Sequence, residues 1–133
     1  MASFLDFLAF NAASMAALIT EHNITHVLNA VEPKFVQTIF SACYTAGANY
    51  LDMALSLSEA HEHDPFHKTG IKLGDAQYAL HEQWQRAGKL ALVGIGVEPG
   101  MSNIFVRYAA DYLFSEIDEA SIKDGGNLVV TDE

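Results

Sequence analysis

The 133-residue sequence predicts an α/β fold with a doubly wound, mainly parallel sheet. Short runs rich in β-forming residues alternate with longer segments whose apolar residues recur at helical spacing, which is the pattern of βαβ units. Several of the short runs are apolar at consecutive positions, as expected of parallel strands that helices cover on both faces. Half of the residues are hydrophobic, so the chain can bury a core of its own.

The first half of the chain is expected to contain three strands and two helices. The second helix carries an apolar stripe that includes Cys43, and Gly47 occupies the position of a C-terminal cap. Because that stripe faces the core, Cys43 is interpreted as a core residue and not as a nucleophile. In chain order the expected elements are a strand at residues 4–10, a helix from a cap at Ser14 to Glu21, a strand at 26–31, a helix at 34–46 and a strand at 49–54.

The second half begins with a long loop, because helical and strand periodicity both fail between residues 55 and 73. Tyr78 and Trp84 lie at helical spacing in the segment that follows and are expected to pack in the core. A strand and a stretch crowded with glycine and proline come next. The expected elements are a helix from a cap at Asp75 to Gly88, a strand at 90–95, a helix at 101–114, a strand at 117–122, and a turn and strand at 124–130.

The chain is strongly acidic, with a formal net charge of -10 from 17 acidic and 7 basic residues. This charge repels phosphate backbones and anionic lipid headgroups, which argues against nucleic-acid binding and against an electrostatic membrane anchor. The apolar residues 1–10 are too few to span a bilayer and lack the basic flank of a signal peptide. Cys43 is the only cysteine, so no intrachain disulfide can form, and a reducing compartment, the cytoplasm, is expected.

Three predicted strand ends carry the candidate ligand-binding residues. In an open parallel sheet, ligands bind outside the carboxyl ends of the strands, where backbone amides and carbonyls are free. The plainer interpretation is that Asn29 forms a turn, that Asp52 is a hydrogen-bonded cap and that Pro99-Gly100 is an ordinary turn. The candidate residues are Asn29, Ala30, Val31, Asp52, Met53, Ala54, Val97, Glu98, Pro99 and Gly100.

An ordered set of short motifs runs through these elements. Asn29-Ala30-Val31-Glu32-Pro33 ends one strand, Ala42-Cys43-Tyr44-Thr45-Ala46-Gly47 ends the following helix, and Tyr50-Leu51-Asp52 begins the next strand. Gly96-Val97-Glu98-Pro99-Gly100 follows a later strand, and Ile122-Lys123-Asp124-Gly125-Gly126 comes near the end. In this order and at these separations, the motifs resemble those of the saccharopine dehydrogenase family.

The resemblance implies a Rossmann-like domain that binds NADP or NAD. It implies that the strand ends at 29–31 and 52–54 line the cofactor cleft. The Glu98-Pro99-Gly100 turn would lie beside the nicotinamide and begin a helix capped by Ser102. Residues 1–115 would then form the NAD(P)-binding domain, and residues 116–133 would start a truncated substrate or dimerisation domain.

The glycine pattern at the start of the chain departs from that of the family. The dinucleotide fingerprint Gly-x-Gly-x-x-Gly must follow the first strand, yet no glycine precedes Gly47. Gly94-x-Gly96 resembles half of that motif, but it lies on a late strand and Pro99 and Gly100 follow it in the wrong places. The sequence therefore predicts a partial Rossmann-like sheet that lacks the first strand and its glycine-rich turn.

The leading functional hypothesis is a fragment of an NAD(P)-dependent oxidoreductase that acts on a C–N bond of an amino acid or polyamine. The fragment is expected to be inactive alone, and no catalytic acid or base is assigned; Asn103 and Asp124 are only candidate contacts. The rival hypothesis is a non-catalytic remnant that serves as a protein-interaction module and pairs an exposed sheet edge, for example with a second copy of itself.

A histidine-rich stretch within the long loop raises the question of a metal site. Imidazoles and carboxylates are common zinc ligands, and several of them gather here. The spacing matches no helical His-Glu-x-x-His site, and Pro65 interrupts the stretch. A solvated acidic loop is therefore the favoured interpretation, with no metal. The residues concerned are His61, Glu62, His63, Asp64 and His67.

Overall fold

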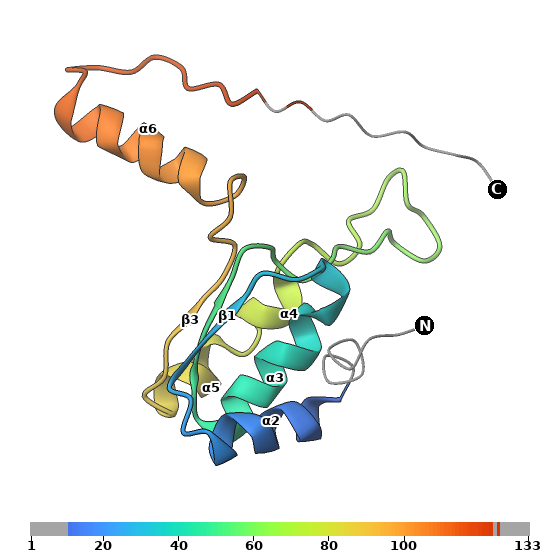
Figure 1. Cartoon of the computed structure of the whole chain (residues 1–133). Coiled ribbons are helices and arrows are strands. Elements are labelled where there is room, and N and C mark those ends of the chain that lie inside the picture. The colour runs from blue at the N-terminus through green and yellow to red at the C-terminus, as the bar shows by residue number, and fades with distance from the viewer. Residues whose placement is uncertain (1–10, 124, 126–133) are drawn as a thin grey trace.

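The computed structural model describes residues 11–123 and residue 125. In this part of the chain, a three-stranded parallel sheet is packed against helices, so the predicted α/β class with a partial Rossmann-like sheet is confirmed (Figure 1). In chain order the elements are α2 (Ala12–Glu21), β1 (His26–Asn29), the 3-10 turn η1 (Pro33–Phe35), α3 (Val36–Ala46), β2 (Asn49–Asp52), α4 (Asp75–Tyr78), α5 (His81–Arg86), β3 (Ala91–Leu92) and α6 (Met101–Tyr112).

The sheet has the order β1-β2-β3, with β2 in the middle. Val27 pairs with Tyr50, and Tyr50 pairs with Ala91, so these three residues share one face of the sheet. Successive residues of a strand point to opposite faces, and Leu28, Leu51 and Leu92 therefore form a row across the other face.

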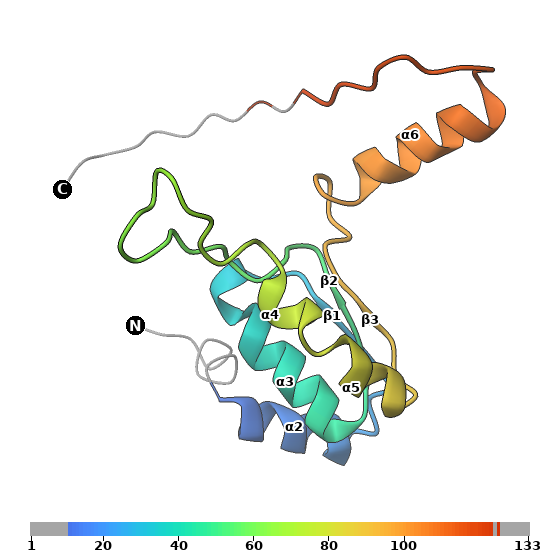
Figure 2. The same cartoon turned by 180° about the vertical axis from the view of Figure 1, so that it is seen from behind.

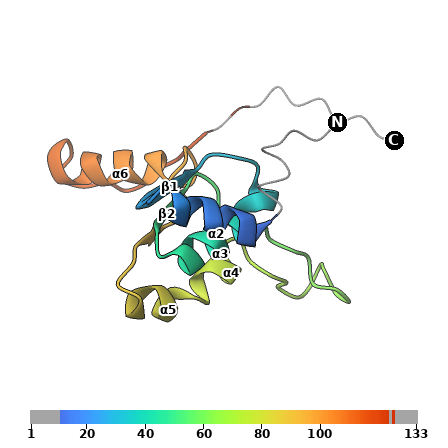
Figure 3. The same ribbon diagram turned by 60° about the horizontal axis from the view of Figure 1, so that its bottom comes forward.

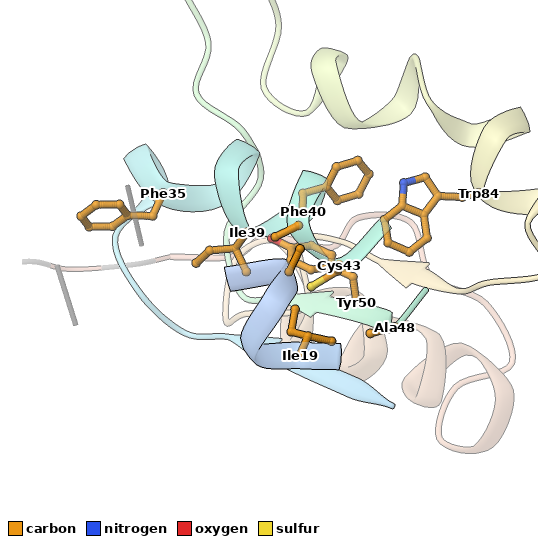
Figure 4. Close-up of a cluster of buried hydrophobic side chains, with 10 residues drawn as sticks. Ile19, Phe35, Ile39, Phe40, Cys43, Ala48, Tyr50 and Trp84 are labelled. Carbon is orange, nitrogen blue, oxygen red and sulfur yellow. The ribbon is translucent and has the colours of Figure 1, made fainter. Parts of the chain in front are cut away.

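The hydrophobic core lies between the helices and the face that carries Tyr50. Figure 3 shows α2, α3, α4 and α5 on one side of the sheet. Phe40 from α3 packs edge-on against Tyr50, with ring centroids 5.1 Å apart, and lies 4.8 Å from the Trp84 ring (Figure 4). Cys43, which is fully buried, faces the same cluster, as predicted.

The opposite face of the sheet is open in the described part of the chain. Leu28 is 63% exposed and Leu92 is 38% exposed. The expectation that helices cover the strand at 26–31 on both faces is therefore wrong for the described residues. Consecutive apolar residues allow a strand to be buried on both faces, but a further helix or strand must then pack on the second face.

The predicted helix caps are confirmed only in part. Gly47 ends α3 in the left-handed conformation, with φ of 70°, as its place in the sequence indicates. Contrary to expectation, Ser14 is not the cap of α2, because the helix starts three residues earlier than that cap would allow. Asn11 is the cap, and its side-chain oxygen accepts a hydrogen bond from the Ser14 amide at 3.0 Å.

The helix predicted from Asp75 to Gly88 is divided into α4 and α5. Gly74, with φ of 83°, precedes α4, and the Asp75 carboxylate accepts from the Lys72 amide at 2.9 Å, so Asp75 is not the cap. Trp84 is 3% exposed and is confirmed as a core residue. Tyr78 is 58% exposed, and its assignment to the core is wrong. Tyr78 lines a surface cavity together with Phe40 and Trp84, where it stays in contact with solvent.

The strands are shorter than predicted, and side chains at the ends of β1 and β2 bind backbone amides beyond the strands. β1 ends at Asn29, whose side-chain oxygen accepts from the Val31 amide at 3.2 Å. β2 ends at Asp52, whose carboxylate accepts from the Gly94 amide at 2.6 Å. β3 contains only Ala91 and Leu92 of the strand predicted at 90–95.

The remaining predictions concern the long loop and the two ends of the chain. The loop at 55–73 is confirmed, and its only ladder contact in the described structure is an isolated antiparallel bridge between Glu59 and Ile71. Residues 117–122 form no strand, contrary to expectation, and are exposed. The strands predicted at 4–10 and 124–130 lie outside the described residues, apart from Gly125.

Helix α6 stands apart from the body of the molecule. Figures 1 and 2 show it beyond the carboxyl ends of the strands and away from α2–α5. Ser102, in its first turn, is the only residue of the helix that is buried. Among the described residues, no helix has the length and apolar character needed to cross a membrane.

Candidate functional site

The three predicted strand ends meet at one edge of the sheet. The Met53 amide donates to the carbonyl of Asn29 at 3.2 Å, which joins the first end to the second. The Ile95 amide donates to the carbonyl of Asp52 at 2.8 Å, which joins the second end to the segment that leads into the 97–100 turn. Parallel strands place their carboxyl ends side by side, so residues far apart in the sequence become neighbours here.

The segment from Gly96 to Gly100 packs backbone against backbone. A Cβ atom on Gly96 would lie 2.3 Å from the carbonyl oxygen of Met53, so no larger residue fits there. Gly100 has φ of 129°, and a Cβ atom on it would lie 2.4 Å from the carbonyl oxygen of Gly96. The Met101 amide closes the turn by donating to the carbonyl of Gly96 at 2.9 Å. Both glycines are therefore required by contacts within the chain.

The ten candidate residues divide into buried, partly buried and exposed groups. Asn29 is 4% exposed and Asp52 is fully buried, so these two polar side chains lie behind the edge. Val31, Met53 and Val97 are 51%, 47% and 64% exposed and form its apolar outer surface. Ala30 and Glu98 are also exposed, whereas Ala54, Pro99 and Gly100 are partly buried. The surface that the edge offers is thus apolar side chains and backbone, with one acidic side chain.

A buried hydrogen-bond network supports this edge from behind. The Asn29 side-chain amide donates to the Tyr50 hydroxyl at 2.9 Å, which donates to the Asp52 carboxylate at 3.0 Å. The Gln77 amide donates to the same carboxylate oxygen at 2.6 Å. Sequence reasoning missed Tyr50 and Gln77. The two-residue spacing of Tyr50 and Asp52 places them on one face of a strand, but no local signal connects Gln77 to them.

The Tyr50 hydroxyl remains a donor in this network. Burial raises the pKa of Tyr50 above its ordinary value, the hydrogen bond from Asn29 lowers it, and the negative charge of Asp52 raises it further. The net effect is a strongly raised pKa, so the hydroxyl keeps its proton and can donate to Asp52 at neutral pH.

Two buried hydroxyl groups flank the edge without a hydrogen-bond partner in the described part of the chain. They are the Oγ atoms of Ser56, which follows the second strand end, and Ser102, which follows the turn. Ser102 does not cap α6, although the resemblance implies that it should. Gly100 is the cap residue, and its amide donates to the Asn103 side chain at 3.0 Å. Buried polar groups without partners are uncommon in folded proteins, so these two hydroxyls are unusual features of the edge.

The histidine-rich stretch makes local pairs. His67 Nδ1 lies 2.8 Å from the Asp64 carboxylate, and the His61 ring accepts from the Asp64 amide at 3.2 Å. His63 is 3.7 Å from the Glu62 carboxylate, and both side chains are at least 80% exposed. Within the described residues, no three histidine, cysteine or acidic side chains are grouped so that they could hold a metal ion.

Zinc is accordingly expected to leave the protein unchanged. Titration with Zn²⁺ should alter neither the emission of Trp84 nor the Tm, because paired and solvated side chains offer no set of converging ligands. Differential scanning calorimetry with and without equimolar zinc is the measurement. A stoichiometric rise in Tm that disappears in the double variant His61→Ala/His67→Ala would contradict this expectation.

Sequence comparison shows which known proteins this chain resembles. A model of the saccharopine dehydrogenase NADP binding domain matches residues 3–92. The chain is 34% identical over 111 residues to carboxynorspermidine synthase of Vibrio cholerae serotype O1, covering 84% of this chain and 26% of that protein. It is 28% identical over 116 residues to carboxyaminopropylagmatine dehydrogenase of a Synechocystis species, covering 87% of this chain and 27% of that protein. The chain thus spans about a quarter of the length of these relatives.

Proposed function

Because the chain belongs to the saccharopine dehydrogenase NADP-binding domain family, we propose that it is the nicotinamide-binding part of an NAD(P)-dependent oxidoreductase. The substrate of the whole enzyme would be an amino acid or polyamine, and the reaction would change the oxidation state of a C–N bond. The names of the two relatives, which mention norspermidine and agmatine derivatives, favour the polyamine class. When bound, the nicotinamide supplies the hydride chemistry.

The convergence of three strand ends at one edge is the observation that carries this proposal. Val31, Met53 and Val97 offer exposed apolar side chains to a flat ring, and the backbone of Pro99-Gly100 lies beside them. Ala30, Ala54 and Glu98 complete the proposed lining. Asn29 and Asp52 act from behind, because their buried side chains hold backbone amides of this edge in place.

The pyrophosphate half of the cofactor does not fit these residues in the same way. No Gly-x-Gly-x-x-Gly sequence occurs in the 133 residues, and the edge carries the acidic Glu98. Backbone amides at a glycine-rich helix start are what hold a pyrophosphate in this type of domain. Within the proposal, residues 1–115 supply the nicotinamide side of the cleft, and residues 116–133 begin the segment that leads to a substrate domain.

A titration with NADPH and NADH tests the proposal. We expect saturable binding, seen as energy transfer from Trp84, the only tryptophan, to the reduced nicotinamide. Val97→Glu should weaken binding about tenfold, or about 1.4 kcal/mol, because it adds negative charge beside an anionic ligand. Leu90→Glu is the matched control, since Leu90 is 56% exposed at the amino end of β3, away from the edge.

The titration separates binding at this edge from other outcomes. Equal weakening by both substitutions would point to general repulsion by net charge and would count against the proposed edge. No saturable binding of either nucleotide by the unaltered chain would contradict the nicotinamide-binding role itself.

A second candidate function is a protein-interaction module, which the open side of the sheet favours. Among the described residues, β1 pairs only with β2, so its other edge presents unpaired amides and carbonyls. Leu28, at 63% exposure, lies in the leucine row on the open face beside that edge. An unpaired edge next to an apolar face is a template for strand addition, and a second copy of the chain is the partner we propose. This function predicts no saturable nucleotide binding, so the same titration discriminates the two.

A further inference from the structure

The Asp52 carboxylate joins three segments that are distant in the sequence. It is fully buried at the end of β2. One oxygen accepts from the Gly94 amide at 2.6 Å, and the other accepts from the Gln77 side chain at 2.6 Å and the Tyr50 hydroxyl at 3.0 Å. All three partners are donors, and hydrogen bonds to a carboxylate are among the stronger ones in proteins.

Gln77 uses both ends of its side-chain amide. The residue is 3% exposed, and while its side-chain nitrogen donates to Asp52, its side-chain oxygen accepts from the Ser56 amide at 2.8 Å. Through these two hydrogen bonds, Gln77 fixes both the start of the long loop and the orientation of the Asp52 carboxylate. A planar amide that is held at both ends has little freedom to rotate.

Asp52 also determines where the turn beside it can lie. Its side chain holds the Gly94 amide, and its backbone carbonyl holds the Ile95 amide at 2.8 Å. Gly96 follows at once and packs against the carbonyl of Met53. In the described part of the chain, no other side chain forms a hydrogen bond with the backbone of residues 94–99. The path into the turn therefore depends on Asp52.

We propose that Asp52 is a positioning residue for the Gly96–Gly100 turn, and that Gln77 orients its carboxylate for that task. The consequence for ligand binding rests on the proposed function: nicotinamide affinity at the edge depends on a buried pair that the ligand does not touch. The loop at 55–73 is linked to the same edge through Ser56 and Gln77.

Asp52→Asn tests the role of the carboxylate. The amide keeps one acceptor oxygen, which suits Gly94, but its nitrogen is a donor and faces the donor nitrogen of Gln77. We expect faster hydrogen exchange at the Gly94 and Ile95 amides, measured by NMR in the free protein. NADPH affinity should fall about tenfold, which is about 1.4 kcal/mol.

The double variant Asp52→Asn/Gln77→Glu is designed to restore the hydrogen bond between positions 52 and 77 with donor and acceptor exchanged. The new side-chain amide at position 52 would donate to one oxygen of the new carboxylate at position 77. The other oxygen of that carboxylate would still accept from the Ser56 amide. The Tyr50 hydroxyl, which already accepts from Asn29, would then face a second donor, and its own proton would lose the acceptor that Asp52 provides. We therefore expect amide protection at Gly94 and NADPH affinity to return part of the way to those of the unaltered protein.

Ile19→Val controls for loss of stability alone. Ile19 is 2% exposed and packs in the core, outside the hydrogen-bond network, so its truncation lowers global stability without altering the turn. NADPH affinity should stay unchanged in this variant. If Asp52→Asn does not fold, Gln77→Leu serves instead, because it keeps the Asp52 carboxylate but removes the hydrogen bond that orients it. Exchange at the Gly94 amide should still rise.

The hydrogen-exchange and binding measurements test two separate parts of the proposal. Unchanged protection at Gly94 in Asp52→Asn, or a double variant no better than the single one, would overturn the positioning role. Altered protection with unchanged NADPH affinity would overturn its consequence for binding. If the unaltered protein bound neither nucleotide, the proposed function would fail, and the exchange data alone would decide whether Asp52 positions the turn.

Discussion

Replacing Phe40 by alanine is expected to cost about 3–5 kcal/mol of unfolding free energy, the usual range for a buried phenylalanine. Phe40 is 1% exposed, and its ring contacts both Tyr50 from the sheet and Trp84 from α5. It therefore ties α3 to the sheet and to α5 through one side chain. Because small domains are stable by only about 5–15 kcal/mol, this substitution should remove a large share of the total stability.

Phe66→Ala is the matched control, since it makes the same chemical change at a side chain that is 91% exposed. Urea denaturation of both variants, followed through the emission of Trp84, gives the two free energies. The control should stay within about 0.5 kcal/mol of the unaltered protein. Similar losses for both variants would mean that the core does not centre on Phe40.

The parts of the fold that the sequence predicts correctly are those with local causes. The apolar stripe of α3 places Cys43 in the core, and Gly47 ends the helix because it adopts a left-handed conformation without strain. The order of strands and helices follows from their alternating periodicities. The meeting of the three strand ends at one edge also follows, because parallel strands bring their carboxyl ends together whatever their side chains are.

The parts that sequence reasoning misses depend on contacts between distant residues. Asp52 looks like a cleft residue, but it is completely buried and accepts from three donors. Gln77 gives no signal of its own, because its partners Asp52 and Ser56 lie more than twenty residues away. Tyr78 has the spacing of a core residue, yet it is 58% exposed. A periodic pattern fixes which side chains share a face, and only packing decides whether that face is covered.

The stability of the protein is expected to fall as the pH rises from about 9 to 12, because of one buried thiol. Burial raises the pKa of Cys43 from its ordinary value of 9.0 to about 12. Below pH 9 the thiol is neutral in both states, and its contribution is constant. Above pH 9 the unfolded chain loses this proton while the folded chain retains it, so the equilibrium shifts toward unfolding. A shift of this size corresponds to roughly 4 kcal/mol over the whole interval.

Cys43→Ala isolates this effect, because it removes the thiol and leaves every other titrating group in place. Both proteins are unfolded with urea under reducing conditions at several pH values between 8 and 11. The stability advantage of the unaltered protein should shrink steadily above pH 9. Alkaline losses from Tyr50, whose pKa burial also raises, should appear in both proteins. Parallel curves would show that Cys43 ionises as readily in the folded state as in the unfolded one. That result would be incompatible with a thiol held among Phe40, Tyr50 and Trp84 in a closed core.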